Sequence, residues 1–126
     1  MPGISYRAFV RQAVNFASGG GKVVLARGVD VSGYREGTLA IRMHDGSSYT
    51  TGTISVKVYR EAPTTEDPAT DYVEATELVK KDFTSATAGA FFLDLANMGA
   101  FLRITAEASS GSNATLILSG DLTLKS

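Results

Sequence analysis

Thr53-Ile54-Ser55-Val56-Lys57-Val58-Tyr59 is the stretch of sequence that decides the fold. Its apolar residues Ile54, Val56 and Val58 alternate with polar and aromatic ones, and such alternation places successive side chains on opposite faces of an extended chain. One face is apolar enough to be buried in a core, while the other carries Lys57 and Tyr59. The stretch therefore predicts a half-buried β-strand.

The same alternation recurs on both sides of this stretch. Shorter apolar runs predict further strands, and the spacing within 72–79 suits either a strand or a short helix. The turn Ser109–Asn113 contains a glycine and small polar residues, so we expect it to join the last two strands into a C-terminal hairpin. The other predicted strands cover residues 22–26, 38–44, 91–95, 100–108 and 114–124.

About seven or eight short strands with turn-rich connections and no long helix indicate an all-β protein. We predict a single antiparallel β-sandwich of jelly-roll or immunoglobulin-like type, with a partly closed barrel as the alternative. Residues 22–126 form this sandwich domain. Residues 1–21 comprise either an extended N-terminal arm or a first strand, together with the Gly-rich joint that begins at Ser18 and leads into Lys22. If they form an arm, deleting residues 1–17 should leave the sandwich folded.

The composition excludes several classes of chemistry. The 126 residues include no cysteine and a single histidine, so disulfides, thiol nucleophiles, thiolate zinc sites and multi-histidine sites are absent. No stretch approaches the roughly 20 apolar residues of a membrane helix, and the first residues lack a secretory leader pattern. We therefore expect no membrane partner and an intact cytoplasmic start.

Charge is unevenly distributed along the chain. The net charge is −1, but residues 1–60 carry +5 and residues 61–126 carry −6. The asymmetry predicts either two faces of opposite sign or strands from both halves that interleave and cancel it in space. A net charge near zero argues against direct nucleic-acid binding.

No catalytic, cofactor or metal site follows from the motifs. The acid-rich segment 61–71 lacks the regular spacing of a calcium loop, so we interpret it as a solvated surface loop rather than a cation site. His44 has Asp45 beside it and serines beyond, but adjacent strand residues point to opposite faces and no nucleophile-elbow sequence is present. His44 is therefore interpreted as an exposed strand-end residue.

A family resemblance adds to this interpretation. Ala26–Val31 leading into Gly37–Arg42, then Gly52–Arg60, Gly99–Thr105 and the ending 114–124 resemble small β-sandwich virion proteins of tailed bacteriophages. The resemblance implies a non-enzymatic structural protein without cofactor, present in the virion in many copies and made in the host cytoplasm. It implies a capsid decoration or head-associated subunit, and less often a tail-associated one, with the major capsid protein or another virion protein as partner.

The sequence also suggests which residues would form the contact. We expect a homo-oligomer, with a trimer as one option, that docks through apolar contacts and charge complementarity. The predicted interface residues are Tyr6, Arg7, Phe9, Arg11, Arg27, Arg35, Tyr59 and Phe101. A carbohydrate-binding or adhesion module that uses surface aromatics such as Tyr34 or Tyr49 is the alternative.

Overall fold

A computed structural model describes residues 4–16, 21–63 and 72–125 of the chain. All regular secondary structure in these ranges is β-strand, and no helix that could span a membrane occurs in them. Their strands are β1 (Ile4–Phe16), β2 (Gly21–Asp30), β3 (Glu36–Met43), β4 (Ser48–Thr51), β5 (Ile54–Pro63), β6 (Tyr72–Phe83), β7 (Gly89–Ala96), β8 (Phe101–Ala108) and β9 (Asn113–Lys125).

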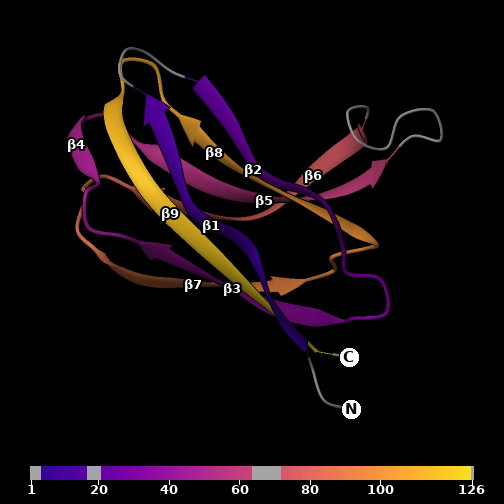
Figure 1. Ribbon diagram of the computed structural model, residues 1–126. Helices are drawn as coiled ribbons and strands as arrows, with labels where there is room; N and C mark the ends of the chain where they lie inside the picture. The colour runs from indigo at the N-terminus through magenta and orange to yellow at the C-terminus, as the bar shows by residue number, and fades with distance from the viewer. Residues whose placement is uncertain (1–3, 17–20, 64–71, 126) are drawn as a thin grey trace.

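The strands form two sheets that pack face to face as a β-sandwich (Figure 1). The first sheet has the order β1-β9-β3-β7, with the short β4 also paired to β9, and the second has the order β2-β8-β5-β6. Every pairing is antiparallel. The two ends of the described chain lie together, because Ile4 pairs with Leu124.

This topology is that of a jelly roll. Apart from β4, eight strands remain, four in each sheet, and the first strand of the chain lies beside the last. That is the arrangement of a double-sheet jelly roll. An immunoglobulin-like sandwich instead places its first two strands in the same sheet, whereas β1 and β2 here belong to different sheets. The sequence left the jelly-roll and immunoglobulin-like types open, and the strand order identifies the jelly roll.

The predicted C-terminal hairpin is wrong. Ser109–Asn113 does form a tight turn, in which the Ser112 N–H donates to the Ser109 carbonyl over 3.1 Å. However, β8 pairs with β2 and β5 in the second sheet, while β9 pairs with β1, β3 and β4 in the first. The turn therefore carries the chain from one sheet to the other, because both flanking strands have an apolar face to bury between the sheets.

The core lies between the sheets and is supplied by the alternating residues. Ile54, Val56 and Val58 are fully buried, which confirms the half-buried strand predicted from this stretch. The inward residues of β3, β8 and β9 are buried in the same way. They are Leu39, Ile41 and Met43 in β3, Leu102, Ile104 and Ala106 in β8, and Ala114, Leu116, Leu118, Leu122 and Leu124 in β9.

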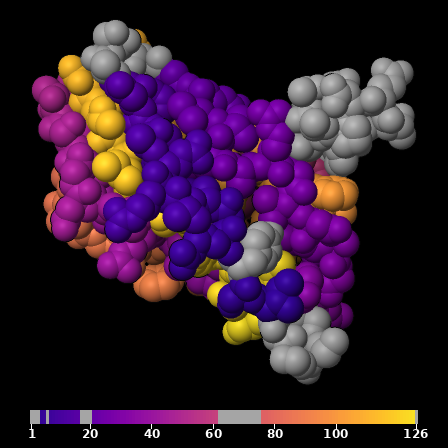
Figure 2. Space-filling model, viewed as in Figure 1, coloured from indigo at the N-terminus to yellow at the C-terminus, as the bar shows by residue number. Residues whose placement is uncertain are grey.

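Residues 4–16 form a strand of the sandwich, not an arm. β1 pairs with β9 along its length and lies between β9 and β2 on the face seen in Figure 2. Phe9, Val14 and Phe16 contribute to the core. Deleting residues 1–17 would therefore open the core, contrary to the expectation that the sandwich stays folded without them. Residues 17–20 of the Gly-rich joint lie outside the described residues.

Two irregularities in β1 decide which of its side chains are buried. The register with β9 shifts between Arg7 and Phe9 and again between Phe9 and Gln12. Each shift inserts an extra residue and reverses the inward and outward alternation. Phe9 consequently points inward opposite Gly120 and is 5% exposed, so it is a core residue and not an interface residue. Val10 points outward, although an uninterrupted strand would place it on the same face as Val14.

Strands from the two halves of the chain interleave in both sheets. Arg7 of the basic half lies 3.1 Å from Asp121 of the acidic half, measured from Nε to Oδ1. Lys57 contacts both Glu77 and Glu107. The interleaving of strands thus pairs charges of the basic half with charges of the acidic half at these contacts, as the second of the two predicted outcomes requires.

Candidate interaction surface

The predicted interface residues do not share one surface. Arg7 and Arg11 lie on the outward side of β1, in the first sheet, whereas Tyr59 and Phe101 belong to the second sheet. Arg35 lies in the turn before β3, where its N–H donates to the Lys125 carbonyl. Arg27 is an exposed residue of β2, and the side chain of Tyr6 lies outside the described ones. The outward faces of the two sheets are therefore two distinct candidate surfaces.

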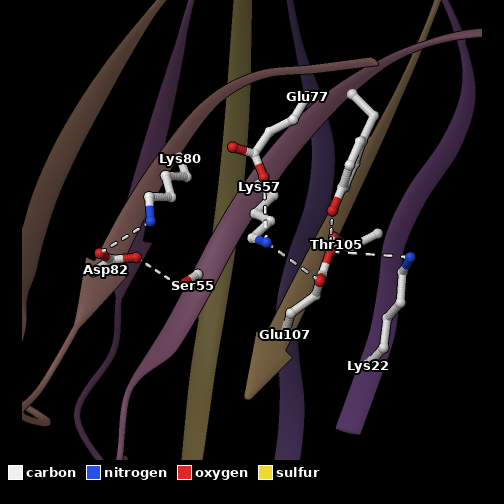
Figure 3. Close-up of polar contacts among 9 residues, drawn as sticks. Lys22, Ser55, Lys57, Glu77, Lys80, Asp82, Thr105 and Glu107 are labelled. Atoms are coloured by element: carbon white, nitrogen blue, oxygen red, sulfur yellow. Dashed lines mark hydrogen bonds and ion pairs between the residues drawn. The ribbon is translucent and has the colours of Figure 1, made fainter. Parts of the chain in front are cut away.

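The outward face of the second sheet, here called the second-sheet face, is organised around Glu107 (Figure 3). The Glu107 carboxylate accepts hydrogen bonds from the Tyr59 hydroxyl and, over 2.9 Å, from the Thr105 hydroxyl. The Lys57 ammonium lies 3.5 Å from the same carboxylate and 3.2 Å from Glu77, and Lys22 lies 4.0 Å from Glu107. The charged groups of this face are thus bound to one another.

Two further contacts extend this network. Ser55 donates a hydrogen bond of 2.5 Å to Asp82, which also pairs with Lys80. The ring of Tyr59 lies close to two cations, with the Arg103 guanidinium carbon 4.7 Å and the Lys22 nitrogen 5.4 Å from its centroid. Tyr59 is therefore held by three neighbours rather than presented to a partner.

The burial of Glu61 differs most clearly from what the sequence predicted. It was assigned to a solvated acidic loop, but it belongs to β5 and is only 3% exposed. Arg103 Nε lies 2.7 Å from Glu61 Oε1, yet the N–H direction does not meet hydrogen-bond geometry, so the contact is an ion pair. Residues 64–71 of the same predicted loop lie outside the described residues.

The pKa shifts follow from these contacts. Burial raises the pKa of the Glu61 carboxyl, and the charges of Arg103, Arg27 and Lys22 offset only part of this shift. Burial also acts to raise the pKa of Glu107, but the hydrogen bonds from Tyr59 and Thr105 and the charges of Lys57 and Lys22 outweigh it and lower that pKa.

The outward face of the first sheet, here called the first-sheet face, is arranged differently. Arg42 of β3 pairs with Ser119 of β9 on one side and Ala90 of β7 on the other. The Arg11 N–H donates to the Ser119 hydroxyl oxygen over 2.8 Å, and His44 Nε2 lies 2.7 Å from that oxygen. β1, β3 and β9 thereby bring Arg11, Arg42 and His44 around one serine, with β7 adjoining.

These residues line two adjoining hollows. One, of about 480 Å³, is bounded by Arg11, Arg42, His44 and Asp45 together with Ala88–Ala90. The other, of about 310 Å³, adds Arg7, Val10, Ser119 and Asp121. Arg11, Arg42 and His44 belong to both. Among the described residues, neither the Arg11 nor the Arg42 guanidinium forms an ion pair.

His44 is partly buried, whereas the sequence suggested an exposed strand end. Burial lowers the pKa of its imidazole, and the positive charges of Arg11 and Arg42 lower it further, while Asp45 acts in the opposite direction. His44 is therefore neutral at neutral pH. Its hydroxyl partner is Ser119, not the nearby Ser47, whose hydroxyl donates to the His44 carbonyl.

The first-sheet face also carries exposed apolar side chains. Phe92 of β7 is 68% exposed and Val10 of β1 is 55% exposed. The partners of Phe92 and Arg42 across the β3–β7 pairing are the alanines Ala40 and Ala90. Neighbours this small cannot cover an aromatic ring. An exposed aromatic beside arginine is the composition of interface centres.

Sequence reasoning missed Phe92 and Arg42. Phe91 and Phe92 are adjacent in a short apolar run, and the sequence alone does not say which one points inward; Phe91 contacts Phe83 and Phe92 is exposed. Alternation in β7 could have indicated the outward face, since Ala90, Phe92 and Asp94 share one face and the more apolar Phe91, Leu93 and Leu95 share the other. Arg42 lies within the predicted strand 38–44, but its nearness to Arg11 depends on the strand order.

The described residues contain no arrangement for metal chemistry. Within residues 4–16, 21–63 and 72–125, no three His, Asp or Glu side chains are grouped to hold an ion. Tyr34 and Tyr49, proposed for sugar stacking, are partly buried and pack against the core. The first-sheet face is therefore the candidate interaction surface.

Comparisons with known proteins concern the fold. No protein-family model matches the sequence, and no curated protein is similar to it. A chain in the solved structure of infectious bursal disease virus, Gx strain, is similar over 97% of this chain, with a TM-score of 0.50 and 12% sequence identity. The matched part is 31% of that chain. At this identity the likeness shows a shared β-sandwich fold.

Proposed function

We propose that this protein is a non-enzymatic structural component of a virus particle. Its jelly-roll strand order is the observation that carries the proposal, because this double-sheet arrangement recurs in viral capsid domains. The similarity of fold to a chain of a virus structure supports the same class. The sequence resemblance narrows the proposal to the capsid of a tailed bacteriophage, which the protein decorates or cements after synthesis in the host cytoplasm.

The first-sheet face is the docking surface in this proposal. It presents an exposed aromatic, Phe92, on the strand next to Arg42, and neither Arg42 nor Arg11 has an ion-pair partner among the described residues. The second-sheet face, in contrast, has most of its charges already paired. A partner that covers the first-sheet face gains apolar area and new charge contacts without first breaking internal ones. The major capsid protein is the proposed partner, and the protein acts in many copies as a homo-oligomer, with a trimer as one option.

Co-sedimentation with particles tests the proposal. The full chain is mixed with particles from its source that lack it, and the bound amount is measured over a range of concentrations. Saturable binding is expected, and Phe92→Ser should weaken it about tenfold or more, as truncation of an interface aromatic does. Lys80→Gln, on the second-sheet face, is the control and should bind as the unmodified chain does. If the unmodified chain does not sediment with particles, the proposal fails.

A further inference from the structure

Arg11 gathers with Arg42 and His44 although β1 and β3 lie on opposite sides of β9. Arg42 and His44 lie two residues apart at the end of β3 and so share the outward face. Arg11 reaches the same place because β1 is irregular there: its φ of 41° is in the left-handed region, which a non-glycine residue rarely adopts. Its N–H is held by Ser119 in this conformation. Local strain of this kind gathers at functional sites.

The hollows that these residues line are open to a ligand of limited size. On the β7 side, the larger one is bounded by Ala88, Gly89 and Ala90, which leave space beside the Arg42 guanidinium. Two guanidinium groups face this space without an ion-pair partner among the described residues, and each offers a fork of donors that matches a carboxylate or a phosphate.

The charge around the hollows favours a single negative charge. Arg7 is paired with Asp121, so those two charges cancel. Asp45 lines the larger hollow and opposes one of the two remaining arginines. His44 is neutral at neutral pH, as described above. The local excess is thus one positive charge, which suits a carboxylate better than a phosphate dianion, and it is too small for a nucleic-acid backbone.

The two adjoining hollows share Arg11, Arg42 and His44 and are here together called the groove. We propose that the groove binds a glutamate or aspartate carboxylate from an acidic segment of the partner protein. This inference deepens the proposed docking function and rests on it for the identity of the partner. The carboxylate lies between the two guanidinium groups, and Phe92 on the neighbouring strand packs against apolar atoms of the same segment.

Because the chain has a single histidine, His44, ligand binding in the groove can be followed by proton NMR. His44 is the only source of an imidazole signal in a proton NMR spectrum. A carboxylate bound beside it favours the imidazolium form, so binding raises the pKa of His44, and by linkage the affinity increases as the pH falls from 7 toward 5.5. The charged groups that face His44 are Arg11 of β1, Arg42 of β3 and Asp45 of the following turn.

The test is a titration of the full chain with a blocked hexaglutamate peptide, followed by the His44 signal between pH 5.5 and 7.5. We expect a saturable shift and an increase in the His44 pKa. Arg42→Gln and Arg11→Gln should each weaken binding about tenfold, while Arg35→Gln, which removes the same charge elsewhere, should change it less than twofold. Inorganic phosphate and a hexalysine peptide are the parallel titrations.

Three results would overturn the inference. The first is the absence of a saturable shift with hexaglutamate, and the second is equal weakening by Arg35→Gln. The third is tighter binding of phosphate than of hexaglutamate, which would assign the groove to a different anion. The particle assay separates this inference from the proposed function: particles that bind the Arg42→Gln chain normally leave the docking function standing without the groove. If the chain binds hexaglutamate but not particles, the carboxylate site stands and the proposed docking function fails.

Discussion

The two outer faces of the sandwich use their charges in different ways. On the second-sheet face, Glu107 accepts hydrogen bonds from two hydroxyl groups and contacts lysines, and Glu61 forms an ion pair with Arg103, so both carboxylates have charge partners on this face. On the first-sheet face, Arg11 and Arg42 form no ion pair with any described residue, and Phe92 is exposed. Both faces are built on the same fold, so the difference lies in how their side chains are paired, and it is the basis on which the first-sheet face is proposed for docking.

The largest expected effect comes from breaking the buried ion pair. Arg103→Gln removes the cation that lies 2.7 Å from the Glu61 carboxylate, and we expect a loss of about 3 kcal/mol in the free energy of unfolding at pH 7. Urea denaturation measures this. Burial already raises the pKa of Glu61, so the deficit should shrink toward pH 4, where the carboxyl is protonated. The double variant Glu61→Leu/Arg103→Leu removes both charges and should be more stable than Arg103→Leu alone. If the two are equally unstable, the unpaired Glu61 charge is not the cause of the loss in stability.

Gly120→Ala should have the next largest effect. A Cβ at position 120 would overlap the ring of Phe9, which lies against this glycine in the core. Displacing the ring should cost about 1–3 kcal/mol. Thermal and urea denaturation measure the loss, and Phe9→Leu in the same chain should recover part of it by relieving the overlap. No recovery would mean that the backbone, not the ring, is strained.

Glu107→Gln tests the hydrogen-bonded centre of the second-sheet face. We expect a loss of about 1–2 kcal/mol at pH 7, because the carboxylate accepts bonds from Tyr59 and Thr105 and contacts two lysines. The pKa of Glu107 is lowered in the folded protein, so its contribution is present above the ordinary value of 4.5 and is lost as the pH falls through the folded pKa. The gap between the two chains should therefore narrow below pH 4.5; a constant gap would contradict this account.

The smallest effect on stability is expected on the first-sheet face. Arg42→Gln is the same substitution as Arg103→Gln, but the Arg42 guanidinium has no ion-pair partner among the described residues. Its free energy of unfolding should change by less than about 0.5 kcal/mol. Urea denaturation of the two variants in parallel measures the difference. If Arg42→Gln lost as much stability as Arg103→Gln, the arginines of both faces would contribute equally to stability, which contradicts the contrast between the two faces.

Much of the strand pattern could be predicted from the sequence. The alternation in 38–44, 53–59, 100–108 and 114–124 gave both the strands and their buried faces correctly, because burial of one face leaves a period of two in the residues. Partner strands could not be predicted in this way. The turn at Ser109–Asn113 has the composition of a hairpin turn, but whether it stays within a sheet or crosses between sheets depends on packing.

The candidate surface was predicted only in part. Arg7 and Arg11 were correctly placed on the outside, whereas Phe9 was not, because the two register shifts in β1 reverse its alternation. Nothing local in the sequence marks those shifts. Tyr59 was predicted to face outward, and it does, but its hydrogen bond to Glu107 depends on a residue 48 positions away.

The sequence by itself determined that this is an all-β protein, which residues of its regularly alternating strands enter the core, and that cysteine chemistry is absent, because these properties depend on local alternation and composition. Only the tertiary structure decided the jelly-roll strand order and brought Arg11, Arg42, His44 and Ser119 together. The physical reason is that strand pairing joins residues distant in the chain, and the register shifts within β1 determine which of its side chains reach the site.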